Sequence, residues 1–197
     1  MASHSSDLTI SVYGHPSANP ESVAGLFGGK HVAQTDGSED VAIFAINPNS
    51  GVDEQTIANW SALDDFQTPR IVVVTELESG EADFDDAVLL ANRLFDQVVT
   101  PYLVLHDDLG APCALISLQT QEIIDYSQIP KKTIPSDPEH QMLVSEFVDE
   151  YATHLAVMGD GAFAAGLLFP AIPLIISKGI GVEIVKTYLS EINRSPN

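Results

Sequence analysis

The chain has 197 residues, of which 45% are hydrophobic, 28 are acidic and only eight are Lys or Arg, so its formal net charge is −20. This length and hydrophobic fraction are typical of one globular domain with a sizeable core, and they exclude a disordered chain. The shortage of cations excludes autonomous binding to nucleic acid, which needs clustered basic residues to displace counterions, and disfavours anionic membranes. The single cysteine, Cys113, excludes an intramolecular disulfide and a metal site with several cysteines.

Two segments bear on targeting. Residues 1–7 have neither the basic nor the apolar region of a secretory signal, so we expect no leader and a cytoplasmic location. The uncharged run Gly161–Ser177 contains Pro170 and Pro173 and is at the short limit for crossing a bilayer. We therefore expect a buried hairpin or core strand there, and no membrane association.

Apolar patterning predicts alternating strands and helices along the chain. Continuous apolar runs such as Val41–Ile46 are typical of strands in the middle of a parallel sheet. The expected strands are residues 8–13, 31–33, 41–46, 71–74, 98–105 and 169–176. The expected helices are residues 22–27, 53–66, 83–96 and 138–158, with a last helix around residues 184–189.

One region departs from this alternation. Residues 113–118 and 122–126 are predicted to pair as an antiparallel hairpin, inside an inserted subregion of about residues 98–130. Residues 130–138 are expected to form a proline-rich connection. The predicted fold class is α/β: one domain over residues 1–197, with three layers and a mostly parallel sheet flanked by helices.

The segment Gly14–Glu21, between the first strand and the first helix, lies where a phosphate-binding loop would be found. Such a loop has the pattern Gly-x-x-x-x-Gly-Lys-Ser/Thr. Counted from Gly14, its second glycine, lysine and hydroxyl residue are replaced by Asn19, Pro20 and Glu21. These changes crowd the phosphate, remove the cation and an N–H donor, and add a repelling negative charge. We predict instead a self-capped helix start, with Asn19 at the N-cap, Pro20 in the first position and Glu21 in the first turn.

Later segments share a pattern with a known family. The chain contains Ser50-Gly-Val-Asp-Glu-Gln-Thr56, Thr68-Pro-Arg before an apolar strand, Ala82-Asp-Phe84 and Phe169-Pro-Ala-Ile-Pro173. In order and spacing these segments resemble the GTP-binding domain of elongation factor G, and above all its actinobacterial elongation factor G-like branch, from about Asp40 to Pro196. The resemblance implies a P-loop GTPase-like fold whose inserted subdomain holds the predicted hairpin. It also places His15 at the family's Gly-His position, although a packed or exposed turn residue is the simpler interpretation.

The departures from the family pattern matter for function. The resemblance places the guanine-reading motif at Thr75-Glu-Leu-Glu78, where Glu78 keeps a carboxylate but Glu76 replaces the family's lysine. The base-backing loop falls near Ser177. Only about fifteen residues lie where the family has its two switches and catalytic histidine, and no Asp-x-Pro-Gly sequence occurs. The resemblance ends where the family would enter its second domain, so the ribosome-contacting domains are expected to be missing.

The candidate nucleotide-binding positions, all in degenerate form, are Gly14, His15, Asn19, Pro20, Glu21, Thr75, Glu76, Glu78 and Ser177.

Other residues that could carry chemistry have simpler structural explanations. The acidic residues between positions 76 and 86 lie at the beginning of a predicted helix, where they complement its dipole rather than form a metal site. His106 and Asp107 are typical of a hairpin turn and have no nucleophile beside them. Cys113 has no neighbouring base or cation in sequence, and Trp60 lies on an apolar helical face, as a core residue does. We predict no catalytic residue and no metal site.

Three functional hypotheses follow. The first is a pseudo-GTPase that has lost the phosphate loop, switches and guanine motif and acts as a protein-interaction module, with no cofactor and no GTPase activity. Its partner is an unidentified protein, with ribosomal or translation-related proteins the class that the resemblance implies. The second is residual binding of GTP or GDP with Mg²⁺. The third is an unrelated small α/β ligand-binding protein whose crevice lies at the C-terminal ends of the strands.

Overall fold

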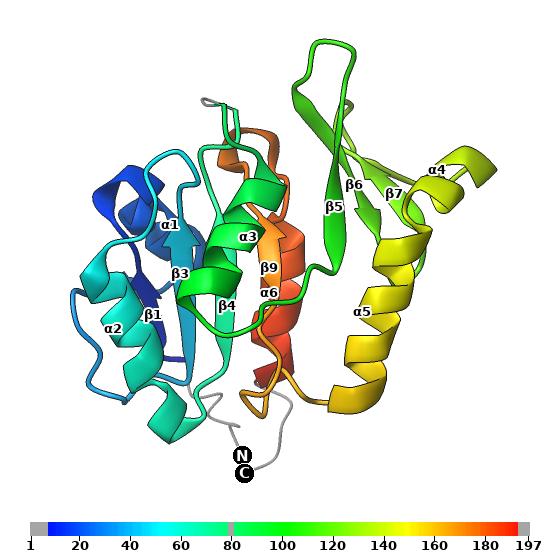
Figure 1. Cartoon of the computed structure of the whole chain (residues 1–197). Coiled ribbons are helices and arrows are strands. Elements are labelled where there is room, and N and C mark those ends of the chain that lie inside the picture. Colours follow the sequence, from blue (N-terminus) through cyan, green and yellow to red (C-terminus); the bar gives the residue numbers. More distant parts are fainter. Residues whose placement is uncertain (1–7, 79–80, 193–197) are drawn as a thin grey trace, which may run out of the picture.

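The apolar runs form the centre of a five-stranded, fully parallel sheet in the computed structural model, which describes residues 8–78 and 81–192 (Figure 1). Every residue of the two central strands, at residues 41–46 and 70–74, is buried, and all of these residues except Arg70 are apolar, as is typical of strands covered on both faces. In spatial order the strands are β2 (Lys30–His31), β1 (Ile10–Tyr13), β3 (Val41–Ile46), β4 (Arg70–Val74) and β9 (Ala171–Pro173).

Helices cover both faces of this sheet and make the predicted three layers (Figure 1). Alternate residues of β3 face opposite sides: Phe44 packs in one core with α2 (Glu54–Ala62) and α3 (Phe84–Leu94). Ile43 packs in the other core with α1 (Pro20–Phe27) and α6 (Val182–Ile192). The predicted α/β class is confirmed.

A second sheet of four antiparallel strands lies beside β9 and α6 (Figure 1). Its strands are, in spatial order, β5 (Tyr102–His106), β6 (Pro112–Ser117), β7 (Glu122–Asp125) and β8 (Lys132–Pro135). The helices α4 (Pro138–Leu143) and α5 (Ser145–Met158) follow it. The insertion is therefore larger than the expected hairpin, because the proline-rich connection contains a strand, β8, that pairs with β7.

Several element boundaries differ from the predictions. The strand expected over residues 98–105 is divided at Pro101: Val99 makes one parallel bridge to Pro170, and the chain then enters the second sheet as β5. A proline lacks the N–H group that a continuous ladder requires. The helix expected over 138–158 is divided at Val144, and the helix expected over 53–66 ends at Ala62 before a 3₁₀ turn, η2 (Asp64–Phe66). The strand expected at 31–33 lies at 30–31.

The uncharged run of residues 161–177 forms turns, β9 and the start of a 3₁₀ helix, η3 (Ile176–Lys178). β9 is short because Ile175 leaves the sheet and exchanges backbone hydrogen bonds with Ile180. Among the helices of the described ranges, none is long and apolar enough to cross a membrane.

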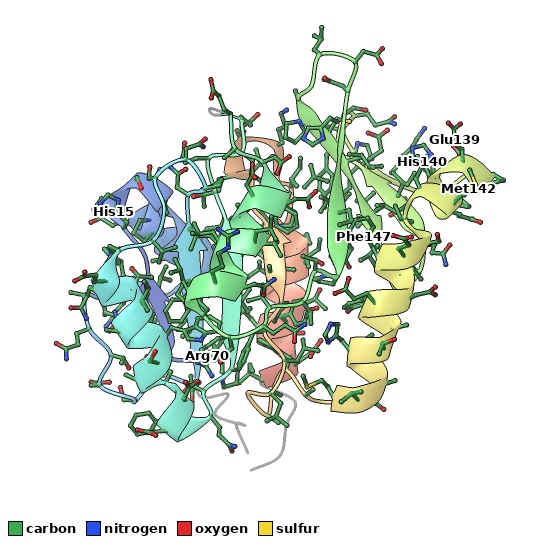
Figure 2. The ribbon with its side chains drawn as sticks, in the orientation of Figure 1. His15, Arg70, Glu139, His140, Met142 and Phe147 are labelled. Carbon is green, nitrogen blue, oxygen red and sulfur yellow. The ribbon has the colours of Figure 1, made fainter. Side chains whose placement is uncertain are left out.

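Arg70 forms a buried cluster at the beginning of β4 (Figure 2). Its guanidinium lies over the rings of Trp60 and Phe169, with Cζ 4.6 and 4.3 Å from their centroids. Its Nη1 is 2.6 Å from an Asp64 carboxylate oxygen and donates to the Trp60 carbonyl at 2.9 Å. Trp60 is 1% exposed, so it is a core residue as predicted.

Candidate functional site

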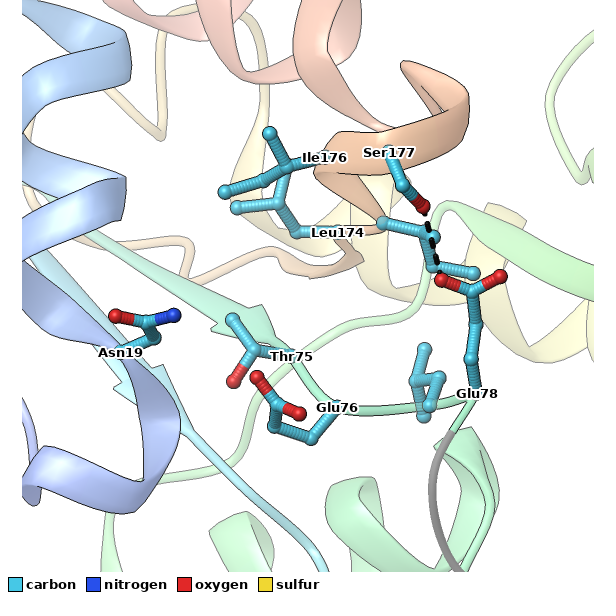
Figure 3. A pocket seen from close by; sticks show the side chains of 9 residues that line it. Asn19, Thr75, Glu76, Glu78, Leu174, Ile176 and Ser177 are labelled. Atoms are coloured by element: carbon cyan, nitrogen blue, oxygen red, sulfur yellow. Dashed lines mark hydrogen bonds between the residues drawn. The ribbon is translucent and has the colours of Figure 1, made fainter.

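The C-terminal ends of the parallel strands meet at one edge of the sheet, where they surround a cavity of about 200 Å³ (Figure 3). It is lined by Asn19, Thr75, Glu76, Leu77, Glu78, Leu174, Ile175, Ile176 and Ser177. Five of the nine candidate nucleotide-binding positions are therefore brought together: Asn19, Thr75, Glu76, Glu78 and Ser177. This edge is the usual ligand position in open α/β sheets.

The other four candidates lie nearby but do not line this cavity. Gly14 and His15 line a second cavity of about 290 Å³, together with Asp53 and Asn59 of the α2 region. Pro20 and Glu21 line neither of these two cavities and occupy the first turn of α1, as predicted.

The loop after β1 begins with a close approach to β3. A Cβ atom on Gly14 would lie 2.5 Å from the carbonyl oxygen of Ala45, so only glycine fits here without a shift of the backbone. The exposed His15 then caps a 3₁₀ helix, η1 (Pro16–Ala18), and its Nδ1 lies 2.8 Å from the Ser17 hydroxyl (Figure 2). His15 is thus an exposed turn residue, one of the two roles expected of it.

The backbone N–H groups of this loop donate to acceptors within the loop itself. The N–H groups of residues 17–19 donate in turn to Nδ1 of His15, the carbonyl of His15 and the carbonyl of Pro16, at 3.2, 2.9 and 3.0 Å. Pro16 and Pro20 have no N–H group. Each of residues 16–20 therefore either lacks a backbone donor or uses it within the loop.

The predicted N-cap position of Asn19 is confirmed, but the usual side-chain hydrogen bond of an N-cap is not made. Asn19 does occupy the N-cap position of α1, but its backbone is left-handed, with φ of 57°, and its side chain accepts no bond from the helix N–H groups. Its Oδ1 instead accepts from the Ser22 hydroxyl at 3.1 Å. The usual N-cap residue has an extended backbone, whereas Asn19 is left-handed and also ends the 3₁₀ turn η1.

Two side chains from the strand ends hold the loop carbonyls. The buried Thr75 hydroxyl donates to the Ala18 carbonyl at 2.9 Å, and Nδ2 of Asn47 donates to the Ser17 carbonyl at 3.0 Å. The sequence placed Asn47 only in a turn. Its partner is 30 residues away, so no local pattern could have revealed the contact.

The carboxylates of the cavity come from the segment after β4. Glu78 accepts from the Ser177 hydroxyl at 2.9 Å (Figure 3) and pairs with Nζ of Lys178 at 3.2 Å. Lys178, which the sequence did not indicate, also donates to the Pro112 carbonyl at 2.9 Å and so links the site to the second sheet. Glu76 has a left-handed backbone with φ of 57°. The two charged residues that line the cavity are thus both acidic.

The other residues that could carry chemistry, such as His106, Asp107 and Cys113, do not line this cavity. Over the described residues, no three His, Cys, Asp or Glu side chains converge as metal ligands would. Burial raises the pKa of the Cys113 thiol, and the carboxylates of Asp107 and Asp125 raise it further. A thiol with a raised pKa is a poor nucleophile at neutral pH.

The chain is similar in sequence to elongation factor G-like proteins. It is 29% identical to one from Mycobacterium tuberculosis over 166 residues, which cover 72% of this chain and 22% of the relative. It is 24% identical to one from Thermotoga maritima over 181 residues, covering 81% and 26%. The predicted resemblance is confirmed, and the chain spans about a quarter of the length of these relatives. No protein-family model matches it.

A crystal structure of a protein from Thermus thermophilus has a similar fold. Its TM-score is 0.66 with 21% sequence identity, and the alignment covers 79% of this chain and 27% of that one. At this identity the likeness concerns the fold.

Proposed function

We propose that this chain, related to elongation factor G-like proteins, is a pseudo-GTPase: a domain with the fold of a GTP-binding domain that binds a protein partner instead of a nucleotide. The observation that carries the proposal is the loop after β1, where residues 16–20 either lack an N–H group or donate it within the loop. A phosphate loop works by directing several such donors at the phosphate oxygens.

Charge supports the same proposal. A nucleotide at this edge would bring phosphate charge to a loop followed by Glu21 and to a cavity lined by Glu76 and Glu78. The nearby cation, Lys178, is already paired with Glu78 and donates to the Pro112 carbonyl of the second sheet. Acidic side chains repel phosphate, and no Lys or Arg is among the described residues that line the cavity. We therefore propose no nucleotide and no Mg²⁺ as cofactors, a cytoplasmic location and a partner from the translation machinery.

Titration with fluorescent GDP and GTP, with and without Mg²⁺, tests the proposal. We expect no saturable binding at micromolar nucleotide, and saturation in that range would overturn it. A triple variant, Asn19→Gly with Pro20→Lys and Glu21→Ser, introduces the family residues into the loop. We expect it to remain without micromolar affinity, because Asn47 and Thr75 still hold the loop carbonyls.

Residual guanine-nucleotide binding is the second candidate function. The observation that favours it is the Glu78 carboxylate, which lines the cavity beside Ser177 as a base-reading acid would. It predicts saturable GDP binding that Glu78→Ala abolishes. A small ligand other than a nucleotide would show itself instead as a molecule that co-purifies with the chain and raises its melting temperature.

A further inference from the structure

His15 caps the 3₁₀ turn η1 through one nitrogen of its imidazole ring (Figure 2). Its Nδ1 accepts from the backbone N–H of Ser17 at 3.2 Å and lies 2.8 Å from the Ser17 hydroxyl. The backbone of His15 is extended, with φ of −64° and ψ of 146°, as is usual for an N-cap residue. An imidazole therefore has the role that a Ser, Asp or Asn side chain has at most helix starts.

The contact with Ser17 determines the tautomer of this ring. A backbone N–H group can only donate, so Nδ1 of His15 must present its lone pair to Ser17 and carry no proton. In the neutral imidazole the single ring proton then lies on Nε2. The Ser17 hydroxyl can donate to the same lone pair, so both contacts of Nδ1 agree with this tautomer.

Protonation of His15 removes the cap. The imidazolium ion carries a proton on each ring nitrogen and has no acceptor, so its Nδ1–H and the N–H of Ser17 would be two donors facing each other. The Ser17 hydroxyl can reverse its role and accept from the charged ring, but the backbone N–H loses its partner. Histidine changes its charge between about pH 5 and pH 8, and the ring of His15 is exposed to solvent.

The charged groups that face His15 come from two other elements. The ring lines the cavity of about 290 Å³ between the loop, β2 and α2, and the other residues of that lining that can carry charge are His31 and Asp53. Asp53 attracts a charged His15, and a charged His31 would repel it. Burial raises the pKa of Asp53, whereas hydrogen bonds from Thr56 and the charge of His15 lower it.

The bond from Ser17 differs from the other internal bonds of this loop. The N–H groups of residues 18–19 donate to backbone carbonyls, which do not titrate. Among residues 16–20, the N–H of Ser17 is the one donor whose acceptor gains a proton near neutral pH. The Ser17 carbonyl accepts from Asn47 at 3.0 Å, so the turn stays attached to the sheet when the cap is lost.

We propose that His15 is a pH-dependent cap of the loop after β1: the neutral ring closes η1 by accepting from the Ser17 N–H, and the protonated ring releases that N–H and loosens the turn. The proposal goes beyond the proposed function, because it requires neither a protein partner nor the absence of nucleotide binding. Either proposal can therefore fail without the other.

Nuclear magnetic resonance of the isotope-labelled whole chain, from about pH 8 to about pH 5, tests the proposal. At the upper pH, the imidazole spectrum should show His15 with a proton on Nε2 and none on Nδ1. As the pH falls, the backbone amide of Ser17 should shift with the same midpoint as the His15 ring. Its protection from hydrogen exchange, corrected for the pH dependence of the intrinsic rate, should fall by about threefold to tenfold, as loss of one hydrogen bond implies.

His15→Asn is the matched variant. Asparagine is a strong N-cap residue whose side-chain oxygen accepts at every pH, so the protection of Ser17 should be kept at the lower pH. His15→Ala should lose the protection at both ends of the pH range. His31→Asn removes the other imidazole of the cavity and should leave the response of Ser17 in place.

Three results would overturn the proposal. The first is a proton on Nδ1 of the neutral His15 ring, a measurement that needs no variant. The second is constant protection of Ser17 while the His15 ring titrates. The third is a response of Ser17 that persists in His15→Asn. Saturable GDP binding at about pH 8 would instead overturn the proposed function and leave the pH-dependent cap unaffected.

Discussion

Thr75→Val isolates the hydroxyl that fastens the loop after β1 to the sheet. The side chain is 4% exposed and its hydroxyl donates to the buried carbonyl of Ala18 at 2.9 Å, across 57 residues of sequence. Valine keeps the shape but cannot donate. A neutral hydrogen bond contributes about 0.5–1.5 kcal/mol, and a carbonyl that loses its donor while buried costs about 1–3 kcal/mol. We expect the free energy of unfolding to fall by about 1–2 kcal/mol.

Urea unfolding at neutral pH measures this loss, and Thr68→Val is the matched control. Thr68 is 5% exposed, and its side chain has no hydrogen bond among those found in the described residues. The control should therefore change stability little. Amide hydrogen exchange should also become faster in residues 17–19 of Thr75→Val, because their bonds lie in the loop that the hydroxyl holds. Equal stability of the two variants would refute the reasoning.

Three further changes have defined outcomes. Gly14→Ala places a Cβ atom 2.5 Å from the Ala45 carbonyl oxygen and should lower the free energy of unfolding by about 2 kcal/mol or more, measured by urea unfolding. An unchanged midpoint of the urea transition would contradict the close approach. Arg70→Met keeps the buried volume but removes two ring contacts and an ion pair, so the free energy of unfolding, measured by thermal unfolding, should fall by about 2–4 kcal/mol. A higher stability of the variant would mean that the desolvation of the charge costs more than its contacts contribute. Burial alone would raise the pKa of Asp53, but hydrogen bonds from the hydroxyl and N–H of Thr56 lower it overall, so its charged form is favoured by folding. Its contribution is complete above the unfolded value near 3.8 and is lost as pH falls through the lower folded pKa. The wild type should exceed Asp53→Asn by about 0.5 kcal/mol at pH 7 and lose this advantage as the pH falls below 3.8, whereas a constant difference would exclude the charge as its cause.

The parts of the fold that could be predicted are those where a local pattern has one physical solution. Runs such as Val41–Ile46 contain no polar residue, and a strand covered on both faces is their natural place. The resemblance to a family then supplied what patterns could not, the convergence of residues 19, 75–78 and 177 from three distant segments. All of these line one cavity.

The parts of the fold that could not be predicted depend on partners that are distant in sequence or on the sign of a backbone φ angle. Nothing local distinguishes residues 132–135 from a loop, since they become a strand only by pairing with β7. Asn19 has a residue type common at N-caps, but its φ is positive and its side chain accepts from the Ser22 hydroxyl instead of a helix N–H group. Lys178 reaches the site from beyond β9 and meets Glu78 across 100 residues of sequence.

The loop after β1 connects these observations into one argument about function. The sequence suggested a self-capped helix start with Asn19 at the N-cap, and the structure shows that the loop N–H groups donate to internal acceptors on His15 and Pro16. A side-chain cap could be removed by one substitution, whereas these bonds are set by two prolines and by the 3₁₀ turn between them. Asn47 and Thr75 then hold the carbonyls of the same turn against the sheet. Nucleotide binding at this loop would require its backbone donors to be freed from these internal bonds, and this is the reason for which we propose a partner-binding role.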